Sequence, residues 1–237
     1  MKIHEYQGRE LLASAGIPVP AGRMVQTIEE AETAASDILK GGAKQVVIKA
    51  QVHAGGRGKA GFVKLVKTAE EARAAAQFML THKMVSPQTG PEGLDVKRLL
   101  VAAAVDIAKE YYLAITVDRA NNTNTLIASA EGGVEIEAVA AKNPDAIKKV
   151  RLHPHLGLQP FQARDLAFAL GFKGKQINQA VNVMQRLAKV FVDSDASLAE
   201  INPLVVTPPN AANPDGEVLA IDAKFNFDDN ALFRQKK

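Results

Sequence analysis

The sequence predicts a fold of the α/β or α+β class, and three observations support this prediction. Segments with helical spacing alternate along the chain with short runs of β-branched residues. The 237 residues are 47% hydrophobic and 23% charged, which is typical of a globular protein with a full core. Glycine and proline residues separate the segments, as expected for turns between short elements.

Capping residues and glycines mark the helix boundaries. Thr27 with Glu30, and Thr68 with Glu71, match the capping box that opens a helix. Glycines follow the first two helical segments and are expected to end them. We therefore predict helices over residues 3–15, 28–40, 69–82, 162–170 and 175–193.

Strands are expected where β-branched residues concentrate. The last two predicted strands, 198–207 and 217–223, flank a loop rich in proline and asparagine, which predicts a β-hairpin. The helix–strand–strand–helix block over 21–96 predicts a smaller lobe, and residues 1–20 and 97–237 would form a larger lobe. The other predicted strands cover residues 45–49, 62–66, 97–105, 111–118 and 125–130.

The composition excludes several classes of function. The chain has no cysteine, which excludes disulfides, thiolate nucleophiles and thiolate metal sites. The formal net charge is +3, the basic residues are scattered and only 5% of residues are aromatic, so nucleic-acid binding is not predicted. The polar N-terminus and the lack of long apolar runs predict no secretion signal and no membrane contact. We therefore expect a cytoplasmic protein.

A glycine-rich loop over residues 51–64 is the first candidate site. Its four glycines allow the backbone to turn sharply and to direct N–H groups at an anion. Lys49 ends the preceding strand, and Arg57, Lys59 and Lys64 add positive charge. The loop therefore predicts phosphate binding. The alternative is an ordinary hairpin turn with solvated charges.

Two familiar phosphate-binding motifs do not fit this loop. Gly56, Gly58 and Gly61 match G-x-G-x-x-G, but a dinucleotide-binding loop opens a helix, whereas this loop opens a β-branched strand. A Walker loop requires Ser or Thr after its lysine, and here Ala60 follows Lys59. A flexible hairpin that covers a triphosphate is the better interpretation.

Polar residues on the last predicted hairpin form the second candidate site. Glu200 and Asn202 are two residues apart, so on a strand they face the same side. Asp222 on the returning strand has apolar neighbours, where an acid without a partner is costly. Mg²⁺ prefers oxygen ligands, so Asn202 and Asp222, with Glu200 as a further candidate, predict a magnesium site. The alternatives are surface polar residues, or an ion pair of Asp222 with Lys224 or Lys49.

Six segments of the chain resemble the β subunit of succinyl-CoA synthetase, and they follow one another in the family's order. The resemblance covers essentially the whole chain and implies an ATP-grasp fold of the α+β class, in which two α+β lobes clamp a nucleotide. Residues 1–237 would then form one ATP-grasp domain. The six segments are Ile3–Gln7, Lys49–Lys59, Asp106–Glu110, Ala130–Glu137, Glu200–Leu204 and Asn230–Gln235.

The resemblance implies roles for residues that would contact ATP. Lys49 would hold the α- and β-phosphates. Gly56, Arg57 and Gly58 would cover the phosphates. Glu110 would accept hydrogen bonds from the ribose hydroxyls.

It also implies a base-binding stretch and a metal site. Ala102 and Val105, in the stretch between the lobes, would lie at the adenine, although the family usually has a glutamate where this chain has Ala102. Asn202 and Asp222 would carry Mg²⁺. No catalytic side chain is expected in this chain itself.

The function implied by the resemblance is the nucleotide-binding part of an ADP-forming succinate–CoA ligase of the tricarboxylic acid cycle. In that family, ATP phosphorylates a histidine of a partner α subunit, phosphate passes to succinate, and CoA displaces it. ATP and Mg²⁺ would be the cofactors, and an α subunit would be the partner in a heterodimer or heterotetramer. A eukaryotic form would lie in the mitochondrial matrix.

Three alternatives to this function stay open at the level of the sequence. They are a malate–CoA ligase, a citryl-CoA synthetase and a non-catalytic module that binds ATP. The family continues past the length of this chain into a second domain, so the carboxylic acid and CoA would bind at a site completed elsewhere.

Overall fold

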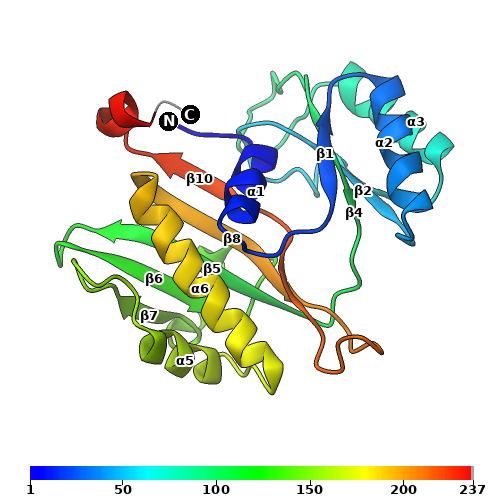
Figure 1. The fold of residues 1–237 in the computed structure, drawn as a ribbon. Helices are drawn as coiled ribbons and strands as arrows, with labels where there is room; N and C mark the ends of the chain where they lie inside the picture. The colour runs from blue at the N-terminus through cyan, green and yellow to red at the C-terminus, as the bar shows by residue number, and fades with distance from the viewer. Residues whose placement is uncertain (236–237) are drawn as a thin grey trace. The chain divides into compact units, whose positions relative to one another are not determined.

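The computed structural model describes residues 1–235, which divide into two compact units (Figure 1). The smaller unit is Pro20–Val105, and the larger unit combines Met1–Val19 with the chain from Asp106 onward. Each unit has an antiparallel sheet with helices packed on it, which confirms the α+β class. The observed division differs from the predicted one mainly at residues 97–105, which lie in the smaller unit.

The sheet of the smaller unit has four antiparallel strands in the order β1-β4-β2-β3. Helices α2 (Ile28–Lys40) and α3 (Ala69–Thr81) lie side by side on one face of this sheet (Figure 1). Their buried residues are mostly alanines, which let the helix backbones come close to the strands. The strands are β1 (Gly22–Val25), β2 (Val46–Ala50), β3 (Val63–Val66) and β4 (Leu99–Ala103).

The two predicted capping boxes form to different degrees. The Thr27 hydroxyl accepts a hydrogen bond from Glu30 N at 3.1 Å, and the Glu30 carboxylate accepts one from Thr27 N at 3.2 Å. At α3, Thr68 accepts from Glu71 N at 3.1 Å, but the Glu71 carboxylate accepts from Lys67 N at 2.7 Å. Both arrangements satisfy backbone donors that a helix N-terminus leaves open.

Strand β4 explains why residues 97–105 lie in the smaller unit. It is hydrogen-bonded to β2 on one side and to β1 on the other, so it is an inner strand of that sheet. The sequence pattern does not predict β1, because only Val25 of its four residues is β-branched. If β1 is not recognised in the sequence, residues 97–105 are naturally assigned to the sheet of the larger unit, whose strands follow them in the chain.

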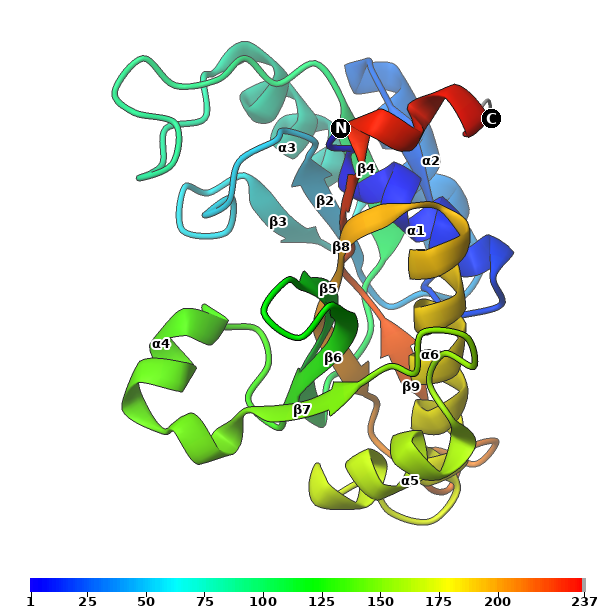
Figure 2. The same cartoon turned by 90° about the vertical axis from the view of Figure 1, so that its left-hand side faces the viewer.

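The larger unit is built on a six-stranded antiparallel sheet in the order β10-β8-β5-β6-β7, with β9 paired to β8. Helices α1 (Glu5–Ser14), α5 (Pro160–Ala169) and α6 (Lys175–Asp193) share its core and cover one face, as Figures 1 and 2 show for α1 and α6. No helix among residues 1–235 is long and apolar enough to cross a membrane. The strands are β5 (Lys109–Asp118), β6 (Thr123–Ser129), β7 (Lys148–Arg151), β8 (Ala196–Val206), β9 (Val218–Ala220) and β10 (Lys224–Phe227).

Some elements of the larger unit lie outside the sequence prediction. Helix α4 (Ile136–Lys142) has only seven residues, and β7 has three basic residues among its four. Short elements of this kind carry too little periodicity to be read from a sequence. The 3₁₀ segments Pro144–Ala146 and Asp229–Arg234 are short for the same reason.

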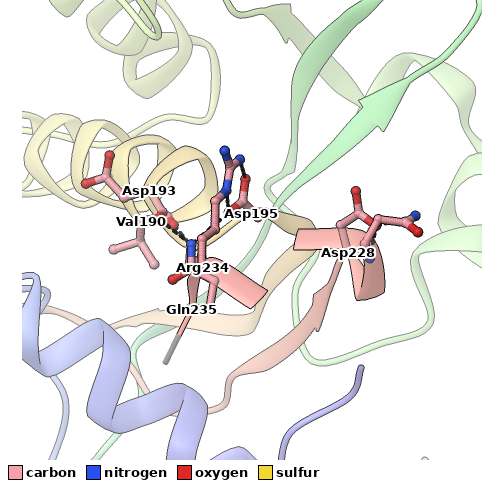
Figure 3. Close-up of polar contacts among 8 residues, drawn as sticks. Val190, Asp193, Asp195, Asp228, Arg234 and Gln235 are labelled. Atoms are coloured by element: carbon pink, nitrogen blue, oxygen red, sulfur yellow. Dashed lines mark hydrogen bonds and ion pairs between the residues drawn. The ribbon is translucent and has the colours of Figure 1, made fainter. Parts of the chain in front are cut away.

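The last described residues are attached to the turn between α6 and β8 (Figure 3). Arg234 Nε donates to Asp195 Oδ2 at 2.8 Å, and Arg234 Nη2 pairs with the other oxygen of that carboxylate. Gln235 Nε2 donates to Asp195 Oδ2 at 2.7 Å and to the Asp193 carbonyl at 3.0 Å. These bonds, that of Arg234 above all, lower the pKa of Asp195 to about 2. The family segment Asn230–Gln235 therefore has a structural role here.

Candidate functional site

In the smaller unit, Lys49 and Ala102 share the sheet face that α2 and α3 do not cover. Ile48 is buried in the core beneath these helices, so the neighbouring Lys49 points to the opposite face. The register pairs Lys49 with Leu100 and Val47 with Ala102, and paired residues of antiparallel strands lie on the same side. The structure therefore places the predicted phosphate lysine and the predicted base-binding alanine on one face.

Ala102 is an inner residue of that face. It is fully buried and pairs with Gly22, where an added Cβ would lie 2.7 Å from the Ala102 Cβ. Its side chain therefore packs between strands and offers no surface to a ligand. Val105 follows the end of β4, is only half-buried, and is the more accessible of the two predicted base contacts.

The glycine-rich loop is a connection between antiparallel strands, as predicted. It joins β2 to β3, whose register includes Lys49 opposite Val63. Because it opens a strand and no helix, it is not a dinucleotide-binding loop. Gly56 and Gly61 have φ of 80° and 78°, a conformation that favours glycine. The tip residue Gly58 is exposed.

Backbone hydrogen bonds shape this loop from within. Ala60 N donates to Gly56 O at 3.0 Å, and Phe62 N donates to Arg57 O at 2.9 Å. The Arg57 guanidinium donates to the Ala50 carbonyl at 3.0 Å, which ties the loop to the end of β2. Arg57 therefore contributes positive charge beside the strand that carries Lys49.

Two further contacts concern this loop: one supports its backbone, and the other separates Lys64 from Lys49. Gln88 Oε1 accepts from Gly55 N at 2.7 Å, so the segment after α3 supports the loop. Lys64 pairs with Ile48, and its ammonium lies 5.9 Å from the centre of the Phe78 ring of α3. Lys64 therefore lies on the helix-covered face and does not join Lys49.

In the larger unit, the candidate residues again lie on the face that the helices leave uncovered. Tyr111 and Leu113 of β5 are part of the core with α5 and α6, so Glu110 and Tyr112 point the other way. On β8, Ile201 is a core residue, and its neighbour Glu200 is outside the core. Glu200 pairs with Ala114 of β5 and with Lys224 of β10.

A β-bulge at Asn202 and Pro203 interrupts the alternation of β8. The register runs from Tyr111 opposite Leu204 to Leu113 opposite Ile201, so Asn202 and Pro203 together face one residue of β5. The peptide bond between these two residues is cis. Before the bulge, Ala199 and Ile201 of β8 face the core. After the bulge, Leu204 and Val206 face it.

Glu200 is a half-buried carboxylate with a tyrosine donor. The Tyr112 hydroxyl donates to Glu200 Oε2 at 3.2 Å. Burial raises the pKa of Glu200, while Lys224 and the Tyr112 hydrogen bond oppose this and nearby Asp222 adds to it. Burial, followed by the charge of Glu200, raises the pKa of Tyr112 far above its ordinary value. Tyr112 therefore stays a neutral donor at physiological pH.

Both polar atoms of the Asn202 amide are bonded to one loop. Gly133 N donates to Asn202 Oδ1 at 2.8 Å, and Asn202 Nδ2 donates to the Val134 carbonyl at 3.0 Å. Gly133 also lies against Glu110, because an added Cβ would be 2.4 Å from Glu110 Oε2. The predicted metal ligand and the predicted ribose acceptor are therefore brought together at Gly133.

Asp222 lies in the link between β9 and β10, whereas the sequence predicts a strand through residue 223. Ala223 N donates to Asp222 Oδ1 at 2.9 Å. Helix α1 packs on this link, since an added Cβ on Gly8 would lie 3.1 Å from the Ala223 Cβ. Burial lowers the pKa of Arg9, and the charges of Glu5 and Asp222 raise it. Helix α1 thus brings a buried guanidinium to the carboxylate of Asp222.

The oxygen donors of the larger unit fit a cation that takes only some of its ligands from protein. Among residues 1–235, no group of three or more His, Asp or Glu side chains is arranged to hold a metal. An amide oxygen at Asn202 and a carboxylate at Asp222 suit Mg²⁺, which completes its shell with phosphates and water.

Tyr112 and Gly133 are absent from the sequence prediction. The adjacent glycines Gly132 and Gly133, in the family segment Ala130–Glu137, are the sequence feature that could have indicated this loop.

Comparison with known proteins agrees with the resemblance seen in the sequence. The ATP-grasp domain family matches residues 2–206. The β subunit of ADP-forming succinate–CoA ligase from Chloroherpeton thalassium is 53% identical over 237 residues, which are 100% of this chain and 59% of the relative. The same subunit from Geobacillus kaustophilus is 53% identical over 234 residues, 99% of this chain and 58% of the relative.

A solved structure supports the fold independently. ATP citrate lyase from Methanothrix soehngenii superposes with a TM-score of 0.73 at 19% identity, over 100% of this chain and 53% of that chain. The chain thus spans about three fifths of the length of the ligase subunits and about half of the lyase. The resemblance to the succinate–CoA ligase β subunit is confirmed, and the chain belongs to the ATP-grasp family.

Proposed function

We propose that this chain binds ATP with Mg²⁺ and forms the nucleotide-binding part of the β subunit of an ADP-forming succinate–CoA ligase. The observation that carries the proposal is the contact of Glu110 and Asn202 with the same glycine, Gly133. It gives one face of the larger unit an acceptor for hydroxyl groups and an oxygen for a cation. The names of the relatives supply the reaction.

The smaller unit would bind the phosphates. Lys49 offers an ammonium on the uncovered face of its sheet, and the loop that begins two residues later can direct N–H groups at an anion. Gly56, Arg57 and Gly58 would cover the phosphates, with Arg57 held near the end of β2. Val105 would contact the base through its exposed surface, and Ala102 would contribute packing only.

The larger unit would bind the ribose and the metal. Glu110 would accept hydrogen bonds from the ribose hydroxyls, and Asn202 and Asp222 would hold Mg²⁺ through oxygen atoms. When bound, Mg²⁺ neutralises phosphate charge and favours transfer of the terminal phosphoryl group. The Tyr112 hydroxyl donates to the Glu200 carboxylate on this face, and the charges of Glu5 and Asp222 both act on the Arg9 guanidinium.

The partner would be an α subunit whose histidine takes the phosphoryl group, with succinate and CoA bound at a site completed outside these residues. We place the reaction in the cytoplasm, or in the mitochondrial matrix of a eukaryote. Malate and citrate are the competing acids.

The proposal is tested in two steps. Calorimetry should first show ATP binding that depends on Mg²⁺, and a chain that binds no ATP would overturn the proposal. The chain is then mixed with the α subunit of a related ligase, the second domain of that ligase's β subunit, and ATP labelled at the γ-phosphate. Label should move to the α subunit, and CoA with succinate should release it faster than CoA with malate or citrate. Binding without transfer would leave a non-catalytic ATP-binding module as the function.

A further inference from the structure

We propose that the loop Glu131–Glu135 is a positioning element, which holds the Asn202 amide in place and, through Gly133, leaves space for Glu110 beside it before any ligand binds. The inference rests on the proposed function, because it assigns to Gly133 the arrangement of the ribose acceptor and the metal ligand. Gly133 itself would touch neither the reacting atoms nor the metal.

The loop fixes which way the Asn202 amide faces. The Val134 carbonyl can only accept a hydrogen bond, so the Asn202 NH₂ group must face it, at 3.0 Å. The Gly133 N–H can only donate, so Asn202 Oδ1 must face it, at 2.8 Å. A rotated amide would lose both bonds. Because a carbonyl oxygen has two lone pairs, Oδ1 keeps one for a cation while the other accepts from Gly133.

The same loop lies beside Glu110, and glycine at position 133 leaves space for the Glu110 carboxylate. An added Cβ on Gly133 would lie 2.4 Å from Glu110 Oε2 and 3.0 Å from its Cδ. Gly133 also has φ of 71°, which favours glycine. An added Cβ on Gly132 would lie 2.5 Å from the backbone N, C and O of Tyr111, so the loop rests directly on β5. The two glycines therefore permit two different contacts, one with a backbone and one with a carboxylate.

The loop is also attached beyond its glycines. Glu131 N donates to the Ser129 Oγ at 3.1 Å, and Ser129 is fully buried at the end of β6. Helix α4 begins at Ile136 directly after the loop. The Ser129 bond thus anchors the start of the loop, and the Asn202 amide holds it at Gly133 and Val134. A displacement of Gly133 would change its hydrogen bond to Asn202 and the space beside Glu110.

The test compares Gly133→Ala with Gly157→Ala. Gly157 lies in the same unit and has φ of 66°, but an added Cβ there meets no atom within 4 Å. Both variants place an alanine at a similar positive φ, and only Gly133→Ala brings a Cβ against Glu110. We expect the Mg²⁺ concentration for half-maximal ATP binding to rise about tenfold or more in Gly133→Ala, the range seen when the support of a metal ligand is lost. Gly157→Ala should leave it unchanged.

Equal Mg²⁺ dependence of wild type and a folded Gly133→Ala would overturn the inference and leave the proposed function standing. If the wild-type chain binds no ATP with Mg²⁺, both proposals fail. A second measurement covers the case in which Gly133→Ala does not fold. Amide hydrogen exchange of Gly133 should be slow in wild type and faster in Asn202→Ala, with the amide of Glu131 as an unchanged reference. A rapidly exchanging Gly133 amide in the wild type would also overturn the inference.

Discussion

The tip of the glycine-rich loop in the smaller unit and the Gly132-Gly133 loop in the larger unit use glycine for different physical reasons. In the smaller unit, an added Cβ at Gly58 or Gly61 meets no atom within 4 Å, so glycine there provides conformational freedom. In the larger unit, Gly132 and Gly133 lie against a backbone and a carboxylate, so glycine there provides space. A glycine-rich segment therefore indicates a movable loop in one case and a close-packed one in the other.

The candidate sites of the two units also differ in charge. The glycine-rich loop of the smaller unit, and the sheet face opposite α2 and α3, carry cations, which suit phosphates. The uncovered face of the larger unit carries carboxylates and an amide, which suit hydroxyl groups and a metal ion. We infer that the candidate site residues of the larger unit hold their positions before ligand binding. The glycine-rich loop of the smaller unit would become ordered only on binding. Each prediction below tests one side of this difference, from the largest expected effect to the smallest.

Lys49→Ala should have the largest effect, because it removes a charged donor from the phosphates. A hydrogen bond to a charged group is worth about 1.5–3 kcal/mol, so ATP affinity should fall roughly ten- to hundredfold. Raising Mg²⁺ should not restore it. Lys64→Ala is the matched control, since Lys64 lies on the opposite face of the same sheet over Phe78. Calorimetric titration measures both, and equal losses would remove Lys49 from the site.

Asp222→Asn should weaken ATP binding about tenfold at limiting Mg²⁺. Here a high Mg²⁺ concentration should recover much of the loss, because the variant keeps an oxygen ligand but loses its charge. Titrating Mg²⁺ at fixed ATP distinguishes this behaviour from that of Lys49→Ala. Asp145→Asn, in an exposed 3₁₀ segment of the same unit, removes the same charge and should change nothing. A loss that Mg²⁺ fails to recover would contradict the metal assignment.

Hydrogen exchange should show the difference between the two loops directly. Residues 51–61 should exchange quickly in the free chain and several-fold more slowly with saturating ATP and Mg²⁺, because phosphate contacts would order them. The amides of Glu131 and Gly133, which donate to Ser129 Oγ and Asn202 Oδ1, should be protected in both states. Mass spectrometry of peptides from the two loops provides the measurement. Rapid exchange of the Glu131 and Gly133 amides in the free chain would contradict a site in the larger unit that is arranged in advance.

Tyr112→Phe should have a smaller effect, on stability. The variant leaves the half-buried Glu200 carboxylate without its hydroxyl donor, which should lower the free energy of unfolding by about 1 kcal/mol. Tyr111→Phe is the matched control, because this neighbouring ring stacks on Phe172 at 4.1 Å and its hydroxyl has no hydrogen-bond partner within residues 1–235. Urea unfolding compares the two, and equal changes would show that the Glu200 contact does not matter.

Much of the fold is predictable from local pattern, as the caps at Thr27 and Thr68 show. The positions that fail depend on contacts distant in sequence. Residues 97–105 belong to the smaller unit only because β1 pairs with β4. The face of Leu204 is set by the bulge at Asn202 and Pro203, which no period-two pattern contains.

The candidate site follows the same rule. Asp222 is recognisable because an acid among apolar neighbours stands out in the sequence. Lys49 is recognisable because it directly precedes the glycine-rich loop. The contact of Gly133 with Glu110 and Asn202 joins residues of three separate segments, so the spacing of the sequence cannot show it. Tyr112 was hidden for another reason, since one tyrosine in a strand of apolar residues is ordinary.

Arg234→Ala should have the smallest effect and should depend on pH. The pKa of Asp195 in the folded chain is about 2, below its ordinary value of 3.8, so its stabilising contribution is complete above 3.8 and is lost as the pH falls toward 2. Wild type should therefore be slightly more stable than Arg234→Ala at about pH 6, and the difference should shrink by about pH 2.5. Lys189→Ala is the control, because it removes another exposed ion pair at the same end of α6, with Asp193 at 2.6 Å. Thermal unfolding at the two pH values measures the difference. A difference that stays constant with pH would show that Arg234 acts through packing, and that the bonds around Asp195 contribute nothing to stability.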